Sequence, residues 1–155
     1  MNLANLLTER HIVADMHSTE HWPAIVELVD HLSRETLLPA ADRRIILEAL
    51  RLREIQSSTG IGNGVAIPHA FSSSLSRVLT VFGRSLRGID FDAIDGAPVR
   101  FVVLFVVPEN QYHIHLRTLA SIAKMFTNSE ILRQLAGATG AGEILDILQA
   151  RPARA

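Results

Sequence analysis

Apolar residues recur at helical spacing in several segments of the chain, and one short segment is apolar without interruption. Residues 18–32, 40–54 and 111–126 carry apolar side chains three and four positions apart, which predicts three amphipathic helices. Shorter helices are predicted over 129–135 and 143–148, with a helical turn over 2–7. The start of the first long helix is predicted from Ser18, a residue type that caps helix N-termini.

The uninterrupted apolar segment, residues 101–107, predicts a strand that is buried on both faces. Further strands are predicted over 12–14, 65–67 and 78–86, whereas 71–74 is predicted to be a loop. A doubly buried strand requires helices on both sides of its sheet. We therefore expect an α/β fold with a single domain over residues 1–150, built on a central mixed five-stranded sheet flanked by helices on both faces. The tail, 151–155, is expected to fray.

Composition narrows the class of protein. A chain of 155 residues with 48% hydrophobic and 20% charged residues has enough apolar material for the packed core of one domain. The absence of cysteine excludes disulfides and thiolate nucleophiles, and a net charge of −1 offers no electrostatic footprint for nucleic acid. The N-terminus lacks the basic and apolar regions of a signal peptide, and no apolar run approaches the ~20 residues of a membrane helix. We expect a cytoplasmic protein that is not embedded in a membrane.

Glycines at every second position mark residues 60–64, and a short apolar stretch that ends at Pro68 and His69 follows. Such glycines permit positive φ angles and the close approach of another group. The spacing fits neither the dinucleotide fingerprint nor the Walker loop, since it precedes a strand and lacks the Gly-Lys-Ser/Thr ending. From the pattern alone, a structural turn and a functional loop stay open. The layout holds one imidazole, His69, at the exit of a rigid strand.

Two other histidine patterns suggest metal sites, and each has a simpler explanation. His17 to His21 matches the H-x-x-E-H form of a zinc protease motif, but these residues lie where a helix is expected to start. His113 and His115 lie on a predicted helix, where a step of ~100° per residue turns the two rings about 200° apart. They cannot share one ion there. The three aspartates of residues 90–95 lack the glycine and glutamate of a calcium loop.

Two further residues, His115 and Arg53, each allow a structural and a functional interpretation. His115 lies one turn before Leu119 and therefore faces the buried side of its helix, whereas His113 faces solvent. A buried histidine is commonly a core residue whose hydrogen bonds are satisfied. A functional role for His115 is the alternative, and both stay open. A solvated Arg53 near the C-terminal end of a helix is stabilised by the helix dipole. Its guanidinium also has the geometry to hold a phosphoryl group beside His69.

The stretch from Ser58 to His69, STGIGNGVAIPH, resembles the enzyme IIA domain of the bacterial phosphotransferase system, fructose/mannitol type. The resemblance covers nearly the whole chain and includes Arg53-Glu54, the stretch FDAIDGAPV at 91–99, and HLRTL at 115–119. Asn63 and the Phe-Asp-Ala-Ile-Asp sequence are most similar to the nitrogen-regulatory branch, which stands alone without a fused permease. Ala70 and Phe71 depart from the glycine and basic residue that commonly follow the histidine, which bears on the docking contacts.

The resemblance implies that His69 accepts a phosphoryl group from a histidine-containing phosphocarrier protein. It implies that His115 and Arg53 assist around the phosphohistidine, with a loop of Gly60, Gly62, Asn63 and Gly64 as the predicted phosphate cradle. No metal and no other cofactor is needed. The expected acceptor is a regulatory target protein or an enzyme IIB.

Three alternatives to a regulatory carrier remain. The first is a sugar-specific enzyme IIA that passes phosphate to an enzyme IIB, and the second is an interaction module that keeps the fold without the chemistry. The third, a metallohydrolase that uses His17 and His21, is the least favoured.

Overall fold

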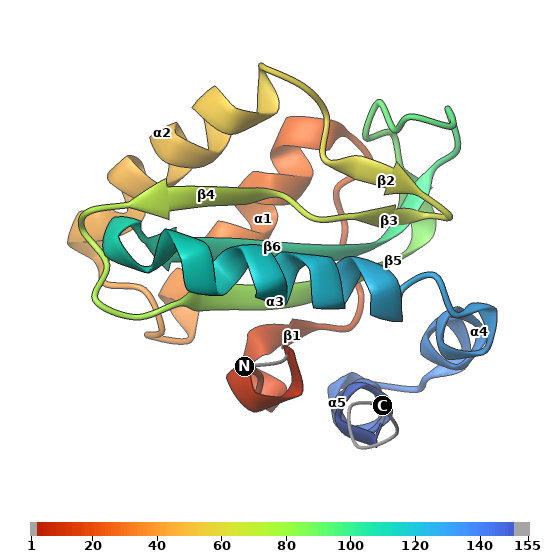
Figure 1. The fold of residues 1–155 in the computed structure, drawn as a ribbon. Helices are drawn as coiled ribbons and strands as arrows, with labels where there is room; N and C mark the ends of the chain where they lie inside the picture. The colour runs from red at the N-terminus through yellow and green to blue at the C-terminus, as the bar shows by residue number, and fades with distance from the viewer. Residues whose placement is uncertain (1–2, 151–155) are drawn as a thin grey trace.

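The computed structural model describes residues 3–150, which form a mixed sheet between two helical layers (Figure 1). The sheet has the strand order β1-β5-β6-β3-β2, and β4 also pairs with β6. The predicted α/β class, the mixed sheet and the single domain are confirmed, but the sheet has six strands where five were expected. The strands are β1 (Ile12–Val13), β2 (Gly60–Gly62), β3 (Val65–Ala66), β4 (His69–Ser72), β5 (Leu79–Ile89) and β6 (Val99–Pro108).

The long central strand β6 organises the sheet. It pairs antiparallel with β5, and on its other edge it pairs in parallel with β3 and then β4. One register runs through both parallel pairs, since Val65 lies opposite Phe101 and His69 lies opposite Phe105. The backbone from β3 to β4 is therefore one extended segment that passes through Pro68.

Two local predictions failed, because β2 pairs with β3 and β4 pairs with β6. Residues 71–74 were expected to be a loop, but β4 continues to Ser72, and the glycine stretch begins with strand β2 instead of a loop. The edge of β6 extends far enough to offer backbone hydrogen-bond partners beyond Pro68. Tertiary pairing of this kind overrides weak local strand propensity.

Helices cover both faces of the sheet, as predicted (Figure 1). One apolar core lies between the sheet and the helices α1 (His21–Arg34) and α2 (Arg43–Glu54). The other lies against α3 (Tyr112–Met125), α4 (Ser129–Gly137) and α5 (Ala141–Ala150). Alternate residues of β6 enter the two cores, with Val102 in the first and Val103 in the second. This double burial explains why β6 is apolar from Phe101 to Pro108.

The helix boundaries differ from the predicted ones at the N-terminal ends. Ser18 does not cap α1, which begins at His21 with Glu20 as its N-cap residue. The backbone N–H groups of His17 and Ser18 instead donate to the carboxylate of Glu27, each at 2.9 Å. A 3-10 helix, Ala40–Asp42, precedes α2, and another, Leu3–Leu6, matches the predicted helical turn. The predicted frayed tail, 151–155, lies outside the described residues.

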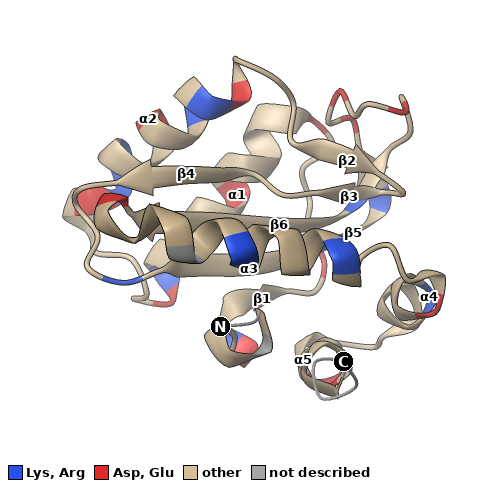
Figure 2. Cartoon of the chain, in the orientation of Figure 1, with Lys and Arg blue, Asp and Glu red and all other residues tan. Residues whose placement is uncertain are grey.

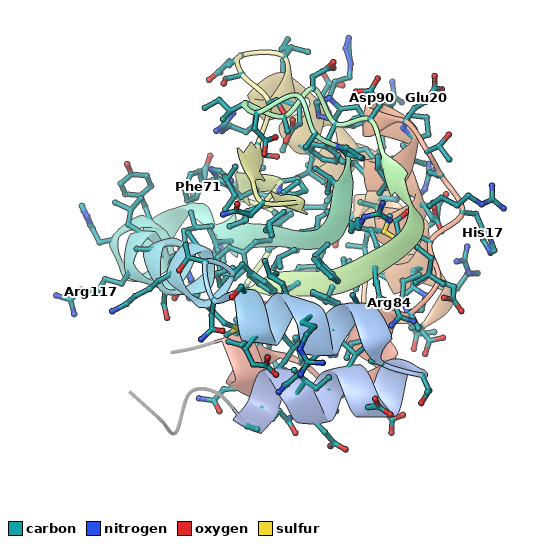
Figure 3. All side chains as sticks on the ribbon, turned by 90° about the vertical axis from the view of Figure 1, so that its right-hand side faces the viewer. His17, Glu20, Phe71, Arg84, Asp90 and Arg117 are labelled. Carbon is teal, nitrogen blue, oxygen red and sulfur yellow. The ribbon has the colours of Figure 1, made fainter. Side chains whose placement is uncertain are left out.

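A buried arginine ties the second helical layer to the sheet. The guanidinium of Arg84 on β5 is 4% exposed and donates to the carbonyls of Ala14 and Leu135, at 2.9 and 3.0 Å (Figure 3). It also lies 3.5 Å from the carboxylate of Asp15. These bonds satisfy a charge that would otherwise be costly to bury. Over residues 3–150, no helix is long and apolar enough to cross a bilayer.

Candidate functional site

His69 is the first residue of β4 and is half-buried beside the end of α2. Its Nδ1 lies 2.8 Å from the carbonyl oxygen of Ile67. A carbonyl only accepts hydrogen bonds, so Nδ1 carries the proton and Nε2 holds the free lone pair. The ring lines a cleft of about 340 Å³, whose other lining residues are Ala49, Leu52, Arg53, Gln56, Ala70 and Phe71.

The surroundings of His69 favour its neutral form. Burial lowers the pKa of the imidazole below its ordinary value of about 6.5, and the nearby charge of Arg53 lowers it further. The bond to Ile67 and the negative charge of Glu54 oppose these effects without reversing them. At neutral pH the ring therefore presents an unprotonated Nε2, as a nucleophile must.

Arg53 lies in the last turn of α2 and lines the same cleft as His69. Its Nη1 donates to the carbonyl oxygen of Ser57 at 2.9 Å, which holds the side chain back along the helix end. The structure thus brings together two residues that lie 16 positions apart in the sequence. The cleft combines a neutral nucleophilic nitrogen with a fixed positive charge, which suits an anionic partner.

His115 on α3 is buried, with only 1% of its surface exposed. Its ring meets the ring of Phe105 edge-on at 5.4 Å, and Phe105 is the strand partner of His69. The Nε2 of His115 donates to Oε1 of Gln111 at 3.2 Å, while its buried Nδ1 has no partner within residues 3–150. Burial lowers the pKa of His115. The predicted buried orientation of His115 and the exposure of His113 are both observed. Within residues 3–150, no hydrogen bond joins the rings of His115 and His69.

The glycine stretch forms the reversal between β2 and β3. Gly62, Asn63 and Gly64 have φ angles of 94°, 58° and 77°, and the Asn63 N–H donates to the carboxylate of Asp95 at 3.2 Å. From Gly64 the backbone runs extended to His69, a span of roughly 16 Å. The structure does not bring this turn to the cleft that His69 lines, and Gly60 contributes no cleft-lining atom. The phosphate cradle stays a prediction.

A second cluster of polar side chains lies beside the first cleft and was missed from the sequence. Glu54 is 8% exposed and accepts hydrogen bonds from His21 and Thr59. A signal was available, because Glu54 continues the buried stripe of Ile46 and Leu50 at spacings of four residues. A carboxylate in an apolar stripe must be paired in the folded protein.

The same cluster replaces the metal site that the His17 to His21 pattern suggested. His21 places Nε2 at 2.6 Å from Glu54 and Nδ1 at 3.5 Å from Asp92. Among residues 3–150, no three histidine or acidic side chains are placed to hold a metal ion together. The histidine is used in an ion pair instead.

Apolar side chains rim the His69 cleft and remain exposed. Leu52 belongs to the cleft wall, and the ring of Phe71 contacts the ring of Tyr112 on α3 at 5.0 Å. Leu116 lies one turn further along α3, and Leu52, Tyr112 and Leu116 are each about half exposed. Helix α3 carries basic residues and no acidic ones, and Phe71 and Arg117 project from the same side of the molecule (Figures 2 and 3). This face combines apolar contact area with positive charge.

Known proteins share the sequence pattern and the fold of this chain. Residues 5–151 match the family described as "Phosphoenolpyruvate-dependent sugar phosphotransferase system, EIIA 2". The chain is 34% identical over 149 residues to a nitrogen regulatory protein of Klebsiella oxytoca, covering 96% of this chain and 90% of that protein. It is 36% identical over 148 residues to the fructose-specific EIIABC component of Bacillus subtilis. That match covers 96% of this chain but only 23% of the longer protein.

Among solved structures, the nitrogen regulatory protein IIA-Ntr of Neisseria meningitidis matches with a TM-score of 0.84 at 35% identity. The match covers 94% of this chain and 98% of that one. IIA mannitol of Escherichia coli matches with a TM-score of 0.76 at 19% identity, covering 92% and 98%, and shows the shared fold alone. The family match spans nearly the whole chain, so the protein belongs to the EIIA 2 family of the phosphoenolpyruvate-dependent sugar phosphotransferase system.

Proposed function

We propose that the protein is a cytoplasmic phosphoryl carrier that accepts a phosphoryl group on Nε2 of His69 from a histidine-containing phosphocarrier protein. It acts as a regulatory protein of the nitrogen type, whose binding to a target changes with phosphorylation. The observation that carries this proposal is the bond between Nδ1 of His69 and Ile67, which leaves Nε2 free in a cleft that Arg53 shares.

The chemistry follows from that arrangement. The lone pair of His69 Nε2 attacks the phosphorus, a new N–P bond forms, and the N–P bond to the donor imidazole breaks. The donor ring leaves with the electron pair of the broken bond. The proton on Nδ1 stays in place, and the carbonyl of Ile67 stabilises the positive charge that the ring acquires.

Two side chains, Arg53 and His115, have supporting roles in this proposal. Arg53 shares the cleft and offsets the charge of the phosphoryl oxygens through its guanidinium. His115 lies behind Phe105 with an unpaired Nδ1, so a phosphoryl anion would raise its pKa and give it a proton to share. The amides of Gly60, Gly62, Asn63 and Gly64 remain a predicted cradle.

A protein donor is supported by the rim of the cleft. Leu52 and Phe71 line the cleft of the nucleophile, and the half-exposed ring of Tyr112 contacts Phe71, so apolar surface adjoins His69 as is typical of the buried centre of a protein interface. A phosphoryl group adds about −1.5 to −2 charge at neutral pH, enough to change which partner this surface favours.

The alternative function is that of a fructose- or mannitol-type enzyme IIA that passes phosphate to an enzyme IIB during sugar uptake. The fructose-specific relative of Bacillus subtilis favours this alternative. An acceptor assay separates the two, because a sugar-specific protein loses its phosphoryl group rapidly to a cognate IIB domain. A regulatory protein keeps it in the presence of the same domains.

The first test is incubation with phosphoenolpyruvate, enzyme I and the phosphocarrier, followed by intact mass measurement. We expect one acid-labile phosphoryl adduct on the wild type and on His113→Ala, an exposed control. His69→Ala should show none while keeping the wild-type circular dichroism spectrum. An adduct that persists in His69→Ala would refute the assignment of the acceptor.

A further inference from the structure

A chain of hydrogen bonds leads from the second polar cluster to His69. His21 Nε2 lies 2.6 Å from Oε2 of Glu54, and the same carboxylate accepts from the N–H and the hydroxyl of Thr59. The carbonyl of Thr59 accepts from the N–H of Ile67 at 3.0 Å. The carbonyl of Ile67 in turn holds Nδ1 of His69 at 2.8 Å. The backbone that orients the nucleophile is thus fastened at its far end to an ion pair.

His21, the first residue in this series of hydrogen bonds, occupies a position in α1 that disfavours its protonated form. His21 is the first residue of α1, where the helix dipole is positive and opposes a protonated imidazole. Hydrogen bonding to Glu54 nevertheless raises the pKa of His21, the charges of Glu54 and Asp92 act in the same direction, and burial opposes them. Arg51 and His21 both line a cleft of about 510 Å³. A break with local preference that a specific partner compensates is typical of functional sites.

We propose that His21 and Glu54 are positioning residues for phosphoryl transfer. The protonated imidazole holds the Glu54 carboxylate, the carboxylate holds Thr59, and the pairing of Thr59 with Ile67 fixes the carbonyl that selects the reactive tautomer of His69. This inference rests on the proposed function for its catalytic meaning, but its structural part does not depend on that function.

The two imidazoles are driven to opposite protonation states. Burial lowers the pKa of His69 below its ordinary value of about 6.5, so this ring is neutral at any pH above that lowered pKa. The Glu54 bond raises the pKa of His21, so this ring stays charged until the pH passes a point above about 6.5. Pairs of titratable groups with pKa values moved apart mark the roles of acid and base sites. Phosphorylation should be fastest in the window between the two values.

The test of the structural part uses long-range ¹H–¹⁵N spectra of the ring nitrogens in the unphosphorylated protein. We expect the wild type and His17→Gln, an exposed control on the same segment, to show a single Nδ1–H tautomer of His69. In His21→Gln and Glu54→Gln, that tautomer should give way to a mixture. An unchanged His69 tautomer in both variants overturns the inference, whether or not the protein is ever phosphorylated.

The test of the catalytic part is the phosphorylation rate of each variant relative to the wild type as a function of pH. His21→Gln should be about ten-fold slower at pH 7, equivalent to one charge-assisted hydrogen bond, and should lack the fall in rate at alkaline pH. His21→Lys keeps a positive charge, so its rate should stay near that of the wild type and its alkaline fall should move to higher pH. His17→Gln should follow the wild type throughout.

The outcomes separate the two proposals. A wild type that takes no phosphoryl group from any cognate donor defeats the proposed function, and the tautomer experiment then decides the inference alone. If the wild type is phosphorylated and His21→Gln shows the same rate and the same fall in rate at alkaline pH, the positioning role is wrong. The carrier function is then unaffected.

Discussion

Two clefts flank the C-terminal end of α2, and each contains one histidine. The cleft of about 340 Å³ contains His69, whose Nδ1 donates to a neutral carbonyl and whose Nε2 is free. The cleft of about 510 Å³ contains His21, whose two nitrogens face the carboxylates of Glu54 and Asp92. The larger cleft contains the ring whose pKa is raised, mainly by the hydrogen bond to Glu54, and the smaller one contains the ring whose pKa is lowered, mainly by burial. A carboxylate partner outweighs burial for His21, whereas a neutral carbonyl partner does not outweigh it for His69.

The largest expected change in stability comes from the carboxylate that separates the two clefts. Glu54→Ala leaves His21 and both donors of Thr59 without their acceptor, so we expect the free energy of unfolding to fall by about 2–4 kcal/mol. The exposed Glu48 on the same helix is the matched control, and Glu48→Ala should stay within about 0.5 kcal/mol. Urea unfolding measures both, and equal losses in the two variants would contradict the buried role of Glu54.

A smaller effect is expected when the positive charge of the His69 cleft is removed. Arg53→Ala should slow phosphorylation about ten-fold, because the guanidinium no longer offsets the phosphoryl charge, and Arg53→Lys should recover part of the rate. Arg51 lines the other cleft, so Arg51→Ala should change the rate by no more than about two-fold. Quenched-flow measurement of adduct formation compares them. Equal slowing by the two alanine variants would show that the clefts are not distinguished by their arginines.

The smallest effect on the phosphorylation rate is expected at the glycine turn. Gly62 has a φ of 94°, so Gly62→Ala should cost about 1–2 kcal/mol of stability, whereas Gly137→Ala at a helix end should cost nothing. Because the turn lies roughly 16 Å from His69 along the extended backbone, we expect the phosphorylation rate of Gly62→Ala to stay within about two-fold. A larger slowing measured below the melting temperature would support the predicted phosphate cradle.

The contrast between the clefts also shows what the sequence reveals about the site. The apolar run of β6 predicted helices on both faces, because a strand buried twice admits no polar position. The stretch before His69 predicted that this residue stands at the exit of a strand, which is wrong because β4 begins at His69. The resemblance assigned the chemistry of His69. Glu54 belongs to the resemblance only as the neighbour of Arg53, but its place in the stripe of Ile46 and Leu50 identifies a carboxylate in need of a partner.

Other features of the site had no local signal. The pairing of β4 depends on the length of β6, some 30 positions later, and strand pairing at that separation is set by tertiary contacts. The partner of His21 lies 33 positions away on another helix, so the H-x-x-E-H pattern could only be interpreted as a local motif. The separation of the glycine turn from His69 followed only once the common register of β3 and β4 on β6 was visible.

We propose that His69 accepts a phosphoryl group on the nitrogen that the Ile67 carbonyl leaves free. The most direct measurement is the ¹⁵N spectrum of the ring nitrogens in the protein after phosphorylation by enzyme I and the phosphocarrier, with assignment through His69→Ala. We predict a phosphoryl group on Nε2 of His69, with Nδ1 still protonated and bonded to Ile67. A phosphoryl group on Nδ1, or on any other of the seven histidines, would contradict the account.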